Sequence, residues 1–258
     1  MEFFVNNFQA FFLILVRINA MIMIAPFFSS GVIPFRLKAI LSFFITLIIF
    51  PVVVQTIKIP GSMGLYYLLV LQEVMIGIFI GFLVSVIFSA FQLSAQYYAV
   101  QIGFGMNEVL DPVGQISVPL IGQLKNFIGL IVFITLEGHH FLIEAIYKSF
   151  ELATMFSVSK SAAGGFLKYL VYSFSGMFIV ALKLSLPILA TALLITVTMG
   201  ILAKAAPQMN IMMFGFPIQI IVGFGMLMIT SPLIIRIMHV ALERSFKFLN
   251  GILVHWPA

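Results

Sequence analysis

The stretch from Gly200 to Gln219 reads GILAKAAPQMNIMMFGFPIQ, and it separates two long apolar runs. Proline lacks a backbone N–H, fixes φ and pushes the preceding residue away from helix. The sequence therefore predicts that a helix ends near Pro207 and that the chain becomes helical again after Pro217. A plain hairpin turn between two spans is the alternative. Broken backbone at membrane depth persists only where protein buries it or where it lines an aqueous cavity. The residues of this helix-break motif, whose polar members could satisfy the freed backbone, are Lys204, Pro207, Gln208, Asn210, Gly215 and Pro217.

The composition is that of a membrane protein. Hydrophobic residues make up 62% of the chain and charged residues only 8%, which is more apolar surface than a soluble domain can hide. The absence of cysteine excludes disulfides, thiolate metal sites and a cysteine nucleophile. The net charge of +5 bears on orientation and lipid headgroups. Because no basic cluster is interleaved with aromatic residues, we expect no nucleic-acid partner.

Hydropathy divides the chain into about six apolar segments, at roughly 8–28, 39–57, 65–100, 116–136, 169–200 and 211–235. A spanning helix needs about 20 residues, so the third and fifth segments are too long for simple spans. They are either tilted or project from the bilayer into an assembly. Pro187 predicts a kink or break within the fifth segment. We therefore expect an all-α integral membrane protein built from bent helical hairpins.

We expect one membrane-embedded domain over residues 1–258, without a separate soluble domain. Six spans would place both termini on one side, and the bias of Lys and Arg puts that side in the cytoplasm. Glu144 and Lys148 are spaced i, i+4 in the favourable order, which predicts a short helix in the polar stretch 144–168. The Ser- and Gly-rich residues 157–165 predict a flexible connection after it.

Small residues recur every four positions in the third segment, behind a carboxylate. On a helix they form one stripe, and small residues let helix backbones approach closely in lipid. We interpret the stripe as a packing seam made of Gly77, Gly81, Ser85 and Ser89.

The carboxylate at the head of this stripe, Glu73, is costly at membrane depth and normally has a partner. The cations that lie in apolar runs are Arg17, Lys125 and Lys183, so we group these four as buried charges. The sequence does not say which cation pairs with Glu73. Structural pairing is the favoured role, and a proton relay is the alternative.

Residues Gln101–Gln115 form a second interruption. Close glycines and an Asp-Pro step predict an irregular loop. An ordinary turn between the third and fourth segments is the alternative, although a turn of this length would not need four large apolar side chains. The residues that we single out in this loop are Gly103, Phe104, Gly105, Met106, Val109, Leu110, Asp111 and Pro112.

Catalytic and metal-binding motifs are weak in this sequence. Glu137, His139, His140 and Glu144 lie close together, but the HExxH pattern is absent and no third ligand is evident. Phosphate-binding and serine-nucleophile signatures are missing as well. We therefore expect no metal site, no cofactor and no enzymatic activity.

Five sequence blocks, in order, carry a resemblance to a known family. Besides 200–219, preceded by SLPILATALL, they are GVIPFRLKAIL (31–41), QEVMIGIFIGF (72–82), QIGFGMNEVLDPVGQ (101–115) and LEGHHFLIEAIYKSF (136–150). Together these blocks resemble the FliR family, the export-gate proteins of flagellar and virulence type III secretion systems. The resemblance covers nearly the whole chain.

This resemblance implies a core subunit of the export gate in the bacterial inner membrane and flagellar basal body, with a cytoplasmic C-terminus. It implies FliP and FliQ subunits as partners in a helical assembly, with FlhB packed around it and unfolded proteins as the cargo. By the same resemblance, the loop at 103–112 is the plug that closes the channel from within, and its residues are the candidate gate residues. Apolar side chains can close an aqueous pore by dewetting it. The block containing PQMN favours the flagellar system over a virulence injectisome. A small secondary transporter, suggested by the broken helix and buried charges, and an intramembrane enzyme are the remaining alternatives.

Overall fold

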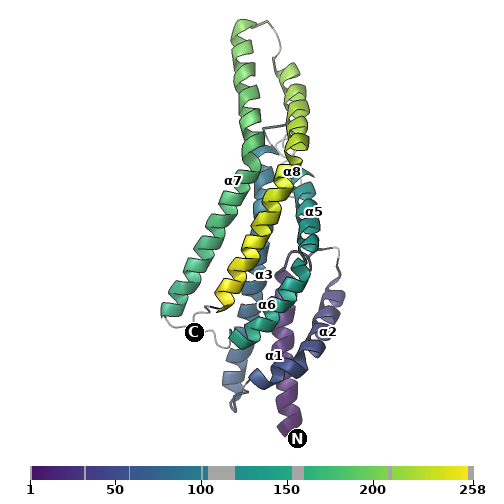
Figure 1. Cartoon of the computed structure of the whole chain (residues 1–258), viewed down its shortest axis with the longest axis vertical. Helices are drawn as coiled ribbons and strands as arrows, with labels where there is room; N and C mark the ends of the chain where they lie inside the picture. Colours follow the sequence, from purple (N-terminus) through teal and green to yellow (C-terminus); the bar gives the residue numbers. More distant parts are fainter. Residues whose placement is uncertain are drawn as a thin grey trace. The chain divides into compact units, whose positions relative to one another are not determined.

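The computed structural model describes residues 2–31, 33–57, 59–99, 101–103, 120–152, 160–208 and 211–254. These residues are almost all helical and include no β-strand, which confirms the predicted all-α class (Figure 1). The helices are α1 Glu2–Ile24, α2 Phe35–Val53, the short 3-10 helix η1 Val54–Thr56, α3 Met63–Ala99, α5 Leu120–Thr135, α6 Gly138–Leu152, α7 Lys160–Ala205 and α8 Ile211–Val254.

Five of these helices are long and apolar enough to cross a membrane, and a sixth span results if α5 and α6 together form one broken span. The short helix predicted around Glu144 and Lys148 is α6, and the two side chains form an ion pair of 2.7 Å. Between α5 and α6, Glu137 has a φ of 53°, a left-handed conformation that is uncommon for a residue with a side chain.

Two sequence predictions about helix boundaries are wrong. Helix α8 begins at Ile211 and includes Pro217, so the chain is helical again before that proline. Helix α7 begins at Lys160, so residues 160–165 are helical and not a loose connection. Helix α7 also continues through Pro187, which excludes a break there, and the kink expected at that proline stays a prediction. One proline removes one N–H, and the hydrogen bonds of the neighbouring turns preserve the helix.

Helix α8 also extends well beyond the apolar segment 211–235, to Val254. Its second half carries Arg236, Arg244 and Lys247. These charged residues lower the local hydropathy, so the predicted apolar segment ended before them. Arg and Lys are nevertheless good helix formers, and the helix continues through them.

The chain divides into two compact units, each assembled from separate segments. Unit 1 comprises Met1–Val86, Leu136–Phe174 and Glu243–Ala258, and unit 2 comprises Ile87–Thr135 and Ser175–Leu242. Helices α3, α7 and α8 contribute residues to both units, so the units are not successive domains along the sequence. The single domain expected over residues 1–258 stays a prediction.

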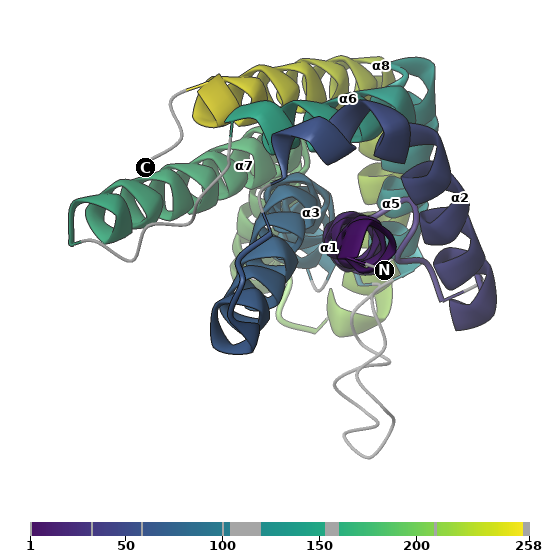
Figure 2. The ribbon, with the colours of Figure 1, turned by 90° about the horizontal axis from the view of Figure 1, so that it is seen from below.

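In unit 1, α1 lies between α2 and the first part of α3, as Figure 2 shows end-on. Phe11 of α1 makes edge contacts with Phe43 and Phe50 of α2, at centroid distances of 5.5 and 5.7 Å. Farther along the chain, Phe141 of α6 stacks on Phe246 of α8 at 4.4 Å. Aromatic contacts of this kind hold the helices of the unit together.

In unit 2, the end of α3 packs against α5. Phe88 meets Phe133 at 5.8 Å, and the side chain of Phe91 lies against Gly129. Helices α7 and α8 form a hairpin, in which α7 ends at Ala205 and α8 begins at Ile211 (Figure 1). Large apolar side chains remain exposed along both helices of the hairpin, among them Leu193, Leu194, Ile221 and Ile229.

Candidate functional site

The small-residue stripe of α3 lies against α1. A Cβ placed on Gly77 would be 2.2 Å from the carbonyl oxygen of Arg17 and 2.9 Å from the Cβ of Ala20. A Cβ on Gly81 would be 2.9 Å from the carbonyl oxygen of Met21. Only glycine fits backbones this close, which is how small residues bring helices together.

The order of the contacts along this seam shows the relative direction of α1 and α3. Tyr66 donates a hydrogen bond of 3.2 Å to the carbonyl of Gln9, Glu73 pairs with Arg17, and Gly81 lies against Met21. Residue numbers rise together along the two helices, so α1 and α3 are parallel where they touch. The close approach at Gly77 therefore places the Arg17 side chain within reach of Glu73, which lies one turn earlier on the same face of α3.

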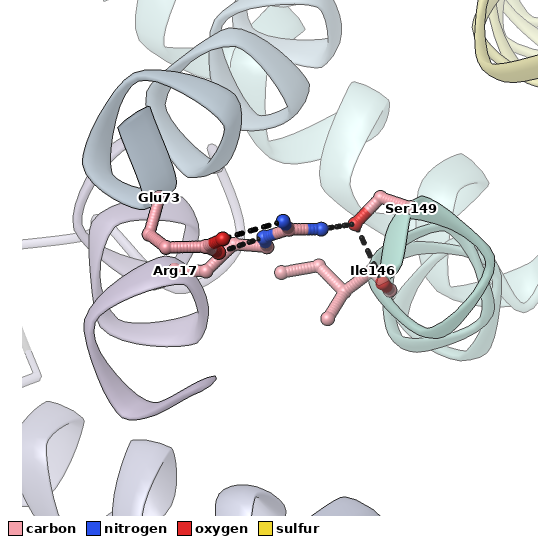
Figure 3. Close-up of polar contacts among 4 residues, drawn as sticks. All are labelled: Arg17, Glu73, Ile146 and Ser149. Atoms are coloured by element: carbon pink, nitrogen blue, oxygen red, sulfur yellow. Dashed lines mark hydrogen bonds and ion pairs between the residues drawn. The ribbon is translucent and has the colours of Figure 1, made fainter. Parts of the chain in front are cut away.

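Arg17, Glu73 and Ser149 form a buried polar cluster, the Arg17 node, that joins α1, α3 and α6 (Figure 3). The guanidinium of Arg17 donates two hydrogen bonds to the carboxylate of Glu73, from Nε to Oε2 and from Nη2 to Oε1, the second at 2.9 Å. Its Nη1 donates to Ser149 Oγ at 2.8 Å, and that hydroxyl donates to the carbonyl of Ile146 at 2.6 Å. The guanidinium carbon also lies 3.9 Å from the centre of the Phe150 ring.

This geometry is that of a structural ion pair. A planar guanidinium matches a carboxylate in a two-point contact, and such pairs are stronger and more directional than single ones. A buried pair does not add much stability over an apolar one, but removing one partner leaves an uncompensated charge. The Arg17 node therefore makes the packing of α1, α3 and α6 interdependent.

Unit 2 contains a second buried cation, in what we call the Lys125 cluster: Ser94, Tyr98 and Lys125. Lys125 Nζ donates to Ser94 Oγ at 2.7 Å and lies 4.8 Å from the centre of the Tyr98 ring. Ser94 Oγ in turn donates to the carbonyl of Phe91 at 2.7 Å. The Tyr98 hydroxyl is buried and makes no hydrogen bond to the described residues.

One other predicted site residue is placed differently from the expectation. Lys183 is exposed on α7, so within this chain it does not belong with the buried charges. Ser85 is half-buried and donates to the carbonyl of Phe82 in its own helix, and Ser89 is exposed. The close contact with α1 is observed at the two glycines, and the packing role of the two serines stays a prediction.

The candidate gate loop is described only at its start. Gly103 has a φ of 87°, where glycine is favoured, and a Cβ there would be 3.2 Å from the side chain of Ile220 on α8. The preceding residue, Ile102, is buried against Gly223, whose Cβ would be 2.7 Å from it. Contacts with α8 therefore anchor the chain where the loop begins. The other predicted gate residues lie outside the described residues: Phe104, Gly105, Met106, Val109, Leu110, Asp111 and Pro112.

The helix-break motif divides between the turn and α8. Lys204 is in the last turn of α7, where a cation suits the helix dipole, and it is exposed, as are Pro207 and Gln208 in the turn. At the end of α7, Ala206 N donates a hydrogen bond of 2.9 Å to the Leu202 carbonyl, and capping of the backbone by Lys204 and Gln208 stays a prediction. Gly215 and Pro217 are helical, and Asn210 lies outside the described residues.

The two histidines of α6 contact each other and a neighbouring carboxylate. His140 Nδ1 is 3.5 Å from the carboxylate of Glu137, at an exposed position, and the rings of His139 and His140 are 4.2 Å apart. Glu144 is engaged by Lys148. Among the residues that the structure describes, no group of three or more possible ligands is arranged to hold a metal ion.

Sequence reasoning missed several members of these clusters. Ser149 and Phe150 complete the Arg17 node, and Ser94 and Tyr98 surround Lys125. Serine and aromatic residues are common in apolar helices, so nothing local distinguishes these four. Only the packing of helices distant in the sequence brings them to the charges.

Comparison with known proteins gives a consistent result. Residues 8–245 match the family described as "Bacterial export proteins, family 1". The flagellar biosynthetic protein FliR of Bacillus subtilis is 28% identical over 98% of this chain and 98% of its own length. The protein of the same name from Pectobacterium carotovorum is 31% identical over 89% and 87%, and that from Escherichia coli is 27% identical over 94% and 92%.

Proposed function

We propose that this chain, which belongs to the bacterial export proteins, family 1, forms part of the wall and the plug of the channel that conducts unfolded flagellar proteins. The family and the relatives named FliR indicate a subunit of the flagellar export apparatus. The long apolar helices, together with the family, indicate an inner-membrane location. The proposal adds what the chain does within that apparatus.

The observation that carries the wall proposal is the unequal burial of the long helices. In its most apolar window, 61% of α3 is buried inside this chain, against 28% for α7 and 17% for α8. Exposed apolar faces of this extent need lipid or other subunits. Small residues and prolines in α7 and α8 suit close helix–helix contact better than a lipid surface alone.

We propose that FliP and FliQ cover much of these faces, that FlhB packs around the assembly, and that lipid covers the remainder. The chain acts as a scaffold for unfolded cargo and not as an enzyme, and its C-terminus lies in the cytoplasm. The Arg17 node supports the scaffold role, because a buried bidentate ion pair holds helices in register.

Single cysteines test the wall proposal, because the chain has none of its own. We would introduce Leu194→Cys or Ile229→Cys into the complete apparatus in cells and attach a photoactivatable thiol reagent. We expect cross-links to other export subunits or to cargo in transit. Leu184→Cys, at a buried position of α7, is the matched control and should remain unmodified. Cross-links to lipid alone, from both exposed positions, would overturn the wall proposal.

The plug proposal rests on the apolar residues of the loop 103–112 and on the anchoring of its start against α8. Apolar side chains exclude water and ions from a closed pore. We expect deletion of Phe104–Leu110 to leave assembly largely intact, since loops carry few packing contacts, and to make cells leak small ions or grow poorly. If the deletion prevents assembly and no leak appears, these residues are a packing element and the gate lies elsewhere.

A further inference from the structure

The Lys125 cluster presents hydrogen-bond donors in excess of acceptors. A lysine ammonium has three N–H donors, and here one of them is used by Ser94 Oγ. Ser94 accepts this bond because its own hydrogen goes to the carbonyl of Phe91. The Tyr98 hydroxyl adds another donor that has no partner among the described residues. We propose that Ser94, Tyr98 and Lys125 form a binding site for a side-chain carboxylate.

The described residues of unit 2 offer Lys125 no counter-charge. The acidic side chains described in this chain are Glu73, Glu137, Glu144, Glu151 and Glu243, and all of them lie in segments of unit 1. Each already has a contact: the first four with Arg17, His140, Lys148 and Tyr147, and Glu243 with a group of its own. The carboxylate must therefore come from elsewhere.

A carboxylate suits this site better than a neutral group does. Only 2% of Lys125 is exposed, and a charge removed from water is stable only when it is paired and hydrogen-bonded. The face of an aromatic ring offers partial compensation for a cation, worth about 2 kcal/mol when desolvated, which is less than the cost of burying the charge. One carboxylate has two oxygens and several lone pairs, so it can accept from both the ammonium and the phenol.

Two sources could supply this same chemistry. Glu108 and Asp111 are the acidic residues in the sequence of unit 2, and both lie outside the described residues. The other source is an acidic side chain of a neighbouring subunit of the export apparatus. The inference does not depend on the wall or plug roles, because it rests on the contacts of Lys125 alone.

Charge reversal at Lys125 tests the site in the full chain, expressed from its own locus in a flagellated strain. We expect Lys125→Glu, which places a second carboxylate against the first, to reduce secretion of flagellar protein tenfold or more, the factor that about 1.4 kcal/mol represents. Lys125→Met should also reduce secretion, and Lys125→Arg should retain most of it. Lys148→Glu and Lys148→Met, at a lysine of α6 whose side chain is 37% exposed, are the matched controls and should stay within about twofold of wild type.

Second-site changes then identify the source. If Glu108→Lys or Asp111→Lys restores secretion to Lys125→Glu, the carboxylate belongs to this chain. If neither does, motile revertants of Lys125→Glu should carry an acidic-to-basic change in another export subunit. Either outcome supports the site.

Two results would overturn the proposal. One is secretion by Lys125→Met and Lys125→Glu equal to that of the Lys148 controls. The other is a set of revertants confined to codon 125 or to apolar neighbours, without any change at an acidic residue. The revertant test remains decisive when the variant chain accumulates poorly. The wall and plug proposals are tested separately, by the cross-linking and loop-deletion experiments.

Discussion

Arg17 and Lys125 are both buried cations with only 2% of their surface exposed, yet their surroundings differ. Arg17 has a carboxylate in a two-point grip, a serine hydroxyl and an aromatic ring, supplied by α3 and α6. Lys125 has a serine hydroxyl and an aromatic ring, both from α3. The two sites thus share every component except the carboxylate.

The difference shows that the two units meet their polar requirements in different ways. Unit 1 closes its ion pair with its own helices, and a glycine seam sets the distance between them. Unit 2 leaves a buried cation without a described carboxylate. Exposed apolar faces do not separate the units, since 22% of the most apolar window of α2 in unit 1 is buried, against 28% for α7 and 17% for α8. The buried cation of unit 2 therefore depends on groups outside the described residues of its unit, whereas that of unit 1 has its carboxylate within the unit.

Removing one partner from the Arg17 node should lower the stability of the export complex more than any other change described below. Arg17→Met leaves Glu73 buried without a cation, and the loss of one partner from a buried pair costs about 3–5 kcal/mol. We expect a lower yield and a lower Tm of the purified export complex in detergent. The double variant Arg17→Met with Glu73→Leu should recover much of both, because it buries no lone charge. A double variant as unstable as the single one would contradict the assignment of this node as a structural pair.

Gly77→Ala tests the close approach that makes the node possible. Its Cβ would lie 2.2 Å from the carbonyl oxygen of Arg17, so α1 must move, at a cost of about 1–3 kcal/mol. Gly64→Ala on the same helix has nothing within 4 Å of its new Cβ and should be neutral or slightly stabilising. The Tm of the complex measures both variants. Equal values for the two would mean that α1 and α3 are not held together at Gly77.

Paired serine variants sharpen the comparison of the two cations. Ser94→Ala removes the hydrogen bond that Lys125 makes to the described residues, whereas Ser149→Ala leaves Arg17 with its carboxylate. A hydrogen bond to a charged group contributes about 1.5–3 kcal/mol. We expect the Tm to fall by more for Ser94→Ala than for Ser149→Ala. The reverse order would show that Lys125 is already well compensated.

The smallest change in the Tm of the complex is expected at the Glu144–Lys148 ion pair of α6. Glu144→Ala removes an i, i+4 ion pair of 2.7 Å whose side chains are both exposed, and such pairs contribute about 0.3–0.5 kcal/mol. The Tm of the complex should hardly change, and high salt should remove the small difference that remains. A loss comparable to that of Arg17→Met would mean that Glu144 has a partner outside this chain.

Prediction from sequence succeeded where the deciding physics is local. The i, i+4 spacing of Glu144 and Lys148 predicted α6, and the approach of Pro207 predicted the end of α7 at Ala205. It failed at Pro217, because the hydrogen bonds of flanking turns outweigh the single one that a proline removes. It failed also at Lys183, since an apolar neighbourhood in sequence does not show which side of a helix is covered.

By itself the sequence determined that this is a helical membrane protein of an export family, because hydropathy, helix-breaking residues and ordered sequence blocks are all carried by neighbouring residues. It also marked Glu73, Gly77 and Gly81 as one face of a helix, since the period of a helix is regular. The tertiary structure alone decided that this face meets α1, that Glu73 takes Arg17 from 56 positions away, and that Lys125 meets a serine and a tyrosine but no described acid. Pairing depends on which helices pack and in what register, and many registers suit the same apolar sequence until side chains from distant segments close around the charges.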